Sequence, residues 1–199
     1  AMNSWNVKFG GKSKRIRVTM PINLRFTGSK MPASNIVSMC FLNRSPDVIS
    51  DEDKLLKSIK VETQYIRKHR MGLTLIRSIK LMSKLSFGYP YNAGGDKACH
   101  STGVLTNLGI VFKKLNMPAD DQGYLKLGRN LKLVDVSTFP PLRPNTHVTL
   151  GLITYGNTFQ LCLSYNKKVI SQENARSLLE HMTARLSSAS QDLARAANA

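Results

Sequence analysis

Histidine, cysteine and carboxylate side chains are the residues most able to do chemistry in this sequence, and they are few and scattered. None of the four histidines has a metal-ligating residue at i+3 or i+4. The three cysteines form no CxxC pair, and GxSxG, P-loop and dinucleotide-binding fingerprints are absent from the sequence. The residues alone therefore predict no catalytic residue, no metal site and no tightly bound cofactor.

Two groups come closest to a functional role. His100 is the one histidine near a predicted strand that ends in a candidate site, although a structural role is the commoner one for such a residue. Asp51, Glu52 and Asp53 stand together, but they open a predicted helix, where acidic residues complement the helix dipole. Neither group forms the acid–base pair that a complete enzyme normally displays.

The charge of the chain is its most unusual property. Lysine and arginine number 29 against 12 acidic residues, which gives a net charge of +17. Residues 1–46 contain eight basic residues and no acid, and residues 54–84 contain nine basic residues and Glu62 as the one acid. Such a field attracts nucleic acid, anionic lipid or a phosphorylated ligand. The alternative reading is a solvated surface on a protein of high pI.

Length and composition indicate a globular protein of about one domain. The 199 residues are 42% hydrophobic and 21% charged, and no apolar run reaches the length of a membrane span. The scarce, odd-numbered cysteines favour a reducing compartment, so we expect a cytoplasmic protein with some peripheral membrane contact allowed by its charge. Ala1 before Met2 is typical of residues left by cloning, and we expect a piece of a longer protein. The expected divisions are a basic leader (1–14), a domain (15–186) and a frayed helix or tail (187–199).

The hydrophobic pattern predicts an α/β fold. Period-two alternation predicts strands, and amphipathic spacing predicts two basic helices, the first beginning at Ser50, and a last helix that begins at Ser171. We expect a two-layer sandwich, a mixed β-sheet with helices packed mainly on one face. The predicted strands are 15–25, 36–42, 99–109 and 130–137.

Residues 148–165 carry the strongest local signal in the chain. Gly156-Asn157 is a two-residue turn between two alternating runs, which predicts a hairpin. Pairing outward from this turn places Leu150, Leu152, Leu161 and Leu163 on one face, where we expect them to be buried.

Three segments resemble the C-terminal half of acyltransferases of the chloramphenicol acetyltransferase-like fold. This superfamily includes condensation domains, wax ester synthases and alcohol acetyltransferases. Residues 18–25 (VTMPINLR), followed by Asn35, resemble the P-V-N/S-L-R strand that opens that half. Residues 102–109 (TGVLTNLG) resemble its V-S-N-hydrophobic-G strand end, and residues 139–186 resemble its closing hairpin and helix.

The resemblance implies half of an enzyme. The family's catalytic HHxxxDG belongs to the N-terminal half and is absent from this sequence, so the chain alone should be inert as a transferase. It would supply one wall of the channel for the acyl donor, an acyl-CoA or a phosphopantetheine thioester on an acidic carrier protein. The channel residues that the resemblance implies are Thr106, Asn107 and Gly109, with Asn35, Arg25 and His100 as supporting positions.

The implied partners follow from the same resemblance. They are the missing N-terminal half, on the same or a separate chain, and acyl-CoA or the carrier protein. Two alternative functions stay open from the residues: a basic nucleic-acid-binding module and a non-catalytic remnant that binds a partner. Duplex nucleic acid is the less favoured partner, because the basic residues do not form one continuous arginine-rich helix and aromatic residues are only 7% of the chain.

Overall fold

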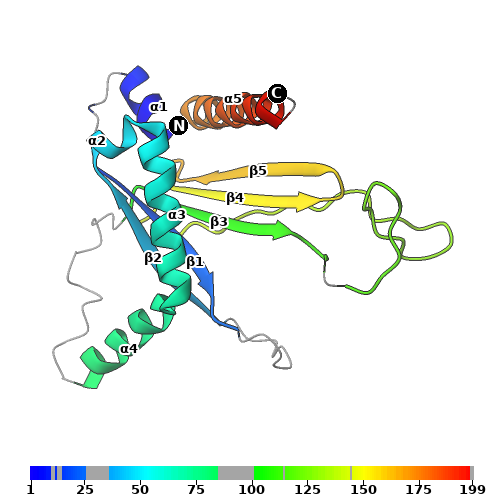
Figure 1. Ribbon diagram of the computed structural model, residues 1–199, viewed down its shortest axis with the longest axis horizontal. Helices are drawn as coiled ribbons and strands as arrows, with labels where there is room; N and C mark the ends of the chain where they lie inside the picture. The colour runs from blue at the N-terminus through cyan, green and yellow to red at the C-terminus, as the bar shows by residue number, and fades with distance from the viewer. Residues whose placement is uncertain are drawn as a thin grey trace. The chain divides into compact units, whose positions relative to one another are not determined.

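The computed structural model describes residues 1–9, 12, 15–25, 36–84, 101–113, 115–143 and 145–197. It is an α/β structure with a five-stranded mixed sheet, in the strand order β2-β1-β3-β4-β5 (Figure 1). The α/β prediction is confirmed at this level. The elements are α1 (Met2–Lys8), β1 (Ile16–Asn23), β2 (Val37–Arg44), α2 (Pro46–Ile49), α3 (Glu52–Lys68), α4 (Met71–Lys84), β3 (Gly103–Ile110), β4 (Val148–Tyr155), β5 (Thr158–Tyr165) and α5 (Gln172–Ala197).

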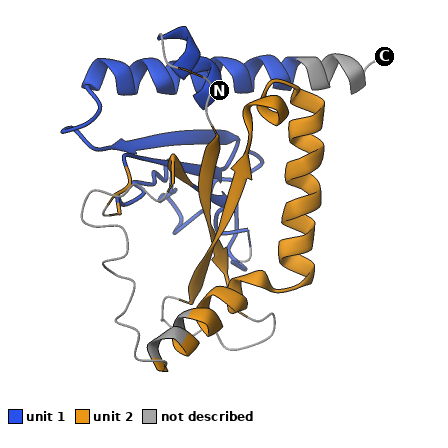
Figure 2. Cartoon of the chain, turned by 90° about the vertical axis from the view of Figure 1, so that its left-hand side faces the viewer, with its two compact units in different colours: residues 1–11, 105–142, 147–199 blue, residues 12–104, 143–146 orange. Residues whose placement is uncertain are grey.

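The chain divides into two compact units (Figure 2). Unit 1 contains residues 1–11, 105–142 and 147–199, and unit 2 contains residues 12–104 and 143–146. Each unit has a hydrophobic cluster of its own. The two units are therefore considered separately below.

Unit 2 is built on the antiparallel pair β1–β2, with the start of β3 added in parallel to β1. Helices α3 and α4 pack against β2, and the core consists of Cys40, Leu42 and Ile66. At the end of β2, the guanidinium of Arg44 lies 2.6 Å from the carboxylate of Glu62 on α3. The acid that stands alone among the basic residues of 54–84 is thus already paired.

The first helix of the predicted pair begins one residue later than expected. Asp51, not Ser50, is the N-cap, and its carboxylate accepts a hydrogen bond from the backbone N–H of Lys54 at 2.9 Å. Aspartate and serine can both accept a hydrogen bond from an unpaired N–H of the first turn. Only the carboxylate also carries a negative charge that complements the helix dipole. The preceding residues form the short helix α2, which the sequence did not predict.

Unit 1 is built on the predicted hairpin, and its register is confirmed at every pair. Gly151 lies opposite Cys162, and Leu150 lies opposite Leu163. Gly156 has φ +53°, a conformation that glycine adopts readily at the first position of a tight hairpin turn. Leu150 is fully buried, and Leu152, Leu161 and Leu163 are half-buried.

Helices α1 and α5 supply the layer that covers one face of this hairpin. Leu178 of α5 is buried against Val148 and Leu150, and Met2 and Trp5 of α1 pack on the same cluster. Ser171 caps α5 as predicted, accepting a hydrogen bond from the backbone N–H of Asn174 at 3.2 Å. Residues 1–14 were predicted to be only a basic leader, yet α1 forms within them because Met2 and Trp5 have this apolar surface to cover.

Helix α5 continues beyond the last residue of its predicted apolar stripe. The apolar stripe ends at Leu186, which is 47% exposed, but the backbone stays helical to Ala197. Residues 187–197 are rich in alanine, and alanine has the highest helix propensity of any residue.

Residues 130–137 were predicted to form a strand, and that prediction is wrong. The segment makes only an isolated bridge, between Lys126 and Lys132. The carbonyl of Leu133 accepts a hydrogen bond from the hydroxyl of Tyr155, and Leu131 and Val134 are exposed. The segment lies on the face of β4 away from α5, where Thr138 and Pro140 contact Gly151. It therefore covers the sheet as irregular structure rather than extending it.

Protonation of His181 should weaken the contact between α1 and α5. Its Nε2 lies 2.9 Å from the hydroxyl of Ser4. Burial, and then the positive charges of the amino terminus, Lys8 and Arg185, hold the pKa of His181 below its usual 6.5. Since the folded pKa is the lower one, this stabilisation is full above pH 6.5 and is lost as the pH falls below it.

Fluorescence of Trp5, the single tryptophan, tests this expectation, because its indole N–H donates to Ser177 on α5 at 3.2 Å. Lowering the pH from roughly 8 to 5 should shift the emission of Trp5 toward that of a more exposed indole. The variant His181→Gln should show no such shift. An identical pH response in this variant would exclude His181 as the cause.

Candidate functional site

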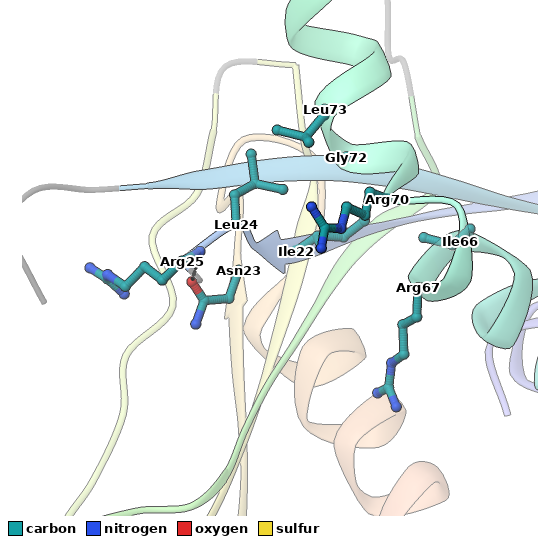
Figure 3. Close-up of a pocket in the computed structure, with 9 residues that line it drawn as sticks. All are labelled: Ile22, Asn23, Leu24, Arg25, Ile66, Arg67, Arg70, Gly72 and Leu73. Atoms are coloured by element: carbon teal, nitrogen blue, oxygen red, sulfur yellow. Dashed lines mark hydrogen bonds between the residues drawn. The ribbon is translucent and has the colours of Figure 1, made fainter. Parts of the chain in front are cut away.

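A pocket in unit 2 is the clearest candidate binding site among the described residues. It lies where β1 ends and where α3 gives way to α4, with a volume of about 270 Å³ (Figure 3). The residues that line it are Ile22, Asn23, Leu24, Arg25, Ile66, Arg67, Arg70, Gly72 and Leu73.

The turn between the two helices shapes this pocket. Helix α3 ends at Lys68, and Arg70 then takes φ +49° before α4 begins at Met71. The hydroxyl of Ser38 on β2 donates to the carbonyl oxygen of Gly72 at 2.7 Å, which holds the first turn of α4 close to the sheet. A Cβ on Gly72 would lie 2.8 Å from Cδ2 of Leu24, so only glycine permits this approach without moving Leu24.

The pocket combines an apolar floor with a cationic rim. Ile66 is buried, and Ile22, Leu24 and Leu73 are half-buried around it. Three arginines and no carboxylate line the pocket. Figure 3 shows the side chain of Arg70 reaching toward Leu24 and Ile22, whereas the side chains of Arg25 and Arg67 point away from Arg70. The N–H groups of a guanidinium can bind two oxygens of a phosphate or carboxylate at once. The pocket therefore suits an anion attached to an apolar group.

The three predicted channel residues lie on β3 in unit 1. The side-chain oxygen of Asn107 accepts a hydrogen bond from the backbone N–H of Gly109 at 2.8 Å, and Gly109 has φ +65°. This is a local turn of the kind that asparagine forms with its own backbone. Asn107 is exposed and Thr106 half-buried. Successive side chains of a strand point to opposite faces, so Thr106 and Asn107 do not line one wall together.

The predicted supporting residues are not brought together with these three. Arg25 lines the pocket of unit 2, whereas Thr106, Asn107 and Gly109 belong to unit 1. His100 and Asn35 lie outside the described residues.

No nucleophile or metal centre is evident in the part of the chain that the structure describes. Within it, no group of three or more histidine, cysteine or acidic residues could hold a metal ion. Burial raises the pKa of Cys40, helped by the nearby charge of Glu62, and burial also raises the pKa of Cys162, so both thiols stay protonated. Nδ1 of His147 is buried without a hydrogen-bond partner among these residues, so nothing orients that imidazole as a base.

Many large apolar side chains are exposed in the stretch of chain that begins beside the predicted channel residues. We call residues 108–142 the apolar segment. Leu108 is 52% exposed and Phe139 is 82% exposed. The exposed large apolar side chains of its described part are Leu108, Ile110, Phe112, Leu115, Met117, Leu127, Leu131, Val134, Phe139 and Leu142.

Sequence reasoning missed both the pocket and these exposed side chains. The run Arg-Lys-His-Arg before Met-Gly is the signal that could have revealed a helix break with several cations beside it. Most of the apolar segment lies between the predicted strands 99–109 and 130–137, where no periodic pattern points to its apolar residues.

Comparisons with protein-family models, with curated proteins and with solved structures find no match for this chain. No helix of the described residues is long and apolar enough to cross a membrane.

Proposed function

We propose that this chain is the donor-binding half of an acyltransferase. The complete enzyme would move an acyl group from a thioester, an acyl-CoA or a carrier-protein thioester, to a hydroxyl or amine. This half would supply a wall of the donor channel, and the other half would supply the catalytic base. The observation that carries the proposal is the exposed apolar segment that begins beside the channel residues of β3.

The exposed side chains of the apolar segment indicate that a ligand or partner covers them. Soluble proteins rarely leave many large apolar side chains of one segment in water unless a partner or ligand covers them. By strand alternation, Thr106 shares a face with Leu108, so a hydroxyl and an apolar side chain stand in one row before the positive φ of Gly109 interrupts the alternation. Such a row suits a thioester arm and its acyl chain, with the missing half covering the rest of the segment.

The three segments that resemble the superfamily coincide with structural elements. The first contains most of β1, the second contains most of β3, and the third contains β4, β5 and the first part of α5. These elements include both the parallel and the antiparallel pairs of the mixed sheet. The proposal is thus compatible with an α/β half-domain of five strands.

The lack of a positioned base supports the second part of the proposal. Acyl transfer to a hydroxyl or amine needs a group that accepts the proton of the acceptor. Among the described histidines, His69 stacks on Tyr65, His181 contacts Ser4, and His147 has its Nδ1 buried and unpartnered. None of these contacts orients an imidazole as a general base.

Calorimetric titration with CoA and octanoyl-CoA tests the donor-binding role. Octanoyl-CoA should bind more tightly than CoA, since each methylene buried on the apolar segment contributes about 0.8 kcal/mol. Thr106→Val should weaken binding of octanoyl-CoA about two- to tenfold through loss of one hydrogen bond. Asn174→Ala, an exposed change on α5, should leave binding unchanged.

A transferase assay on the same samples tests the incomplete active site. The chain alone should release no CoA from octanoyl-CoA in the presence of alcohol or amine acceptors. Turnover by the chain alone would contradict the assignment of the base to another half. Equal affinities for CoA and octanoyl-CoA would contradict the acyl-binding role of the apolar segment.

A further inference from the structure

Arg70 has a backbone conformation that its side chain disfavours. Its φ of +49° lies in the left-handed region, which glycine adopts freely and arginine does not. Helix ends commonly place glycine at such a position, and here the glycine comes two residues later, at Gly72. A disfavoured backbone at the rim of a pocket is the kind of outlier from which a binding role can be inferred.

The position of the Arg70 side chain offers a reason for its disfavoured backbone conformation. It reaches over the apolar floor formed by Leu24 and Ile22 (Figure 3). A glycine would relieve the backbone but would remove this guanidinium from the pocket.

The electrostatics of the pocket favour a ligand of more than one negative charge. Arg25, Arg67 and Arg70 line it, and no acidic residue does. The first turn of α4, with Gly72 and Leu73, also lies at the pocket, and the N-terminal end of a helix carries partial positive charge. A phosphate group is close to doubly charged near neutral pH, so it suits this positively charged pocket better than a carboxylate does.

The size and floor of the pocket define the rest of the ligand. The pocket has a volume of about 270 Å³, which suits a small ligand, and the floor of Ile22, Leu24, Ile66 and Leu73 is apolar. We propose that this pocket binds the phosphate group of a small amphiphile, with Arg70 on the phosphate and a short apolar group against Leu24 and Leu73. The proposal is independent of the proposed acyltransferase function, since every lining residue belongs to unit 2.

Hexyl phosphate is the probe for this pocket. It should bind at least about tenfold more tightly than inorganic phosphate, because only hexyl phosphate covers the apolar floor. Arg70→Gly should weaken binding of hexyl phosphate roughly ten- to hundredfold. Arg77→Gln is the matched control, since Arg77 is an exposed arginine of α4 that does not line the pocket.

Thermal unfolding separates binding from folding in these variants. Arg70→Gly should still fold cooperatively, because glycine accepts the positive φ at this position. Equal loss of binding in Arg77→Gln would overturn the proposal, because binding would then depend on net charge and not on the pocket.

Gly72→Ala tests the apolar part without changing any charge. The added Cβ would lie 2.8 Å from the far end of the Leu24 side chain, so this part of the apolar floor would have to move. Hexyl phosphate should then lose affinity while inorganic phosphate keeps it. Hexyl phosphate that binds no more tightly than inorganic phosphate to the unmodified chain would overturn the proposal.

Competition with CoA identifies where the phosphate comes from. Displacement of hexyl phosphate by CoA would support a nucleotide-type phosphate as the ligand of this pocket. Retention of hexyl phosphate against excess CoA would support a lipid-like phosphate as its ligand.

Discussion

Replacing Leu150 with alanine should lower the free energy of unfolding by about 2–5 kcal/mol, the range for truncating a buried leucine. Leu150 is 2% exposed and packs against Val148 and Leu178, with Leu163 opposite it on β5. Truncation would leave a cavity between the hairpin and α5 that neither rigid element can collapse to fill. Urea denaturation followed by circular dichroism measures the change.

Leu186→Ala is the matched control for this experiment. It makes the same chemical change on α5, where the leucine side chain is 47% exposed. Its cost should stay within about 0.5 kcal/mol, as for most surface substitutions. Equal costs for the two variants would mean that the interface between the hairpin and α5 is not the core of unit 1.

Removing the hydroxyl of Tyr155 should lower the free energy of unfolding by about 1–3 kcal/mol, the cost of a buried polar group left without a partner. The hydroxyl donates to the carbonyl oxygen of Leu133 at 2.8 Å and accepts from the backbone N–H of Leu125 at 3.0 Å. Leu125 is itself buried, so Tyr155→Phe leaves its N–H without a partner or water. The apolar segment should detach from β4 before the rest of unit 1 unfolds.

Hydrogen exchange at the amide of Leu125 is the direct measurement. Exchange should accelerate in Tyr155→Phe, and Tyr165→Phe should leave it unchanged because the Tyr165 hydroxyl makes no hydrogen bond within the described residues. Unchanged protection of Leu125 in Tyr155→Phe would show that the segment is held to β4 by other contacts.

The features predicted correctly from sequence are those with short-range causes. The turn at Gly156-Asn157 fixes every pair of the hairpin, because shifting the register by one residue would move its apolar residues to the other face. The cap at Ser171 and the amphipathic spacing of α5 depend on residues within two helical turns of each other. Such signals can be interpreted without knowledge of the rest of the fold.

The features that the sequence did not reveal depend on distant residues. Met2 and Trp5 form a helix because α5, far along the chain, offers an apolar surface. The segment 130–137 alternates like a strand, but a side chain of β4 takes the backbone carbonyl that a neighbouring strand would have used. The pocket requires the approach of Gly72 to Leu24, which no local pattern encodes.

The parallel ladder between β1 and β3 has a large loop-closure entropy to overcome. It pairs Val18 with Gly103 and Thr19 with Val104, and the adjoining contact joins Arg17 to Thr102 across 85 residues. Closing a flexible loop of that length costs roughly 4 kcal/mol before any constant term. Two cross-strand pairs contribute only about 0.2–1 kcal/mol each. The ladder is therefore sustained by the apolar burial around it, and loosening that burial would open the sheet at this parallel seam before the hairpin.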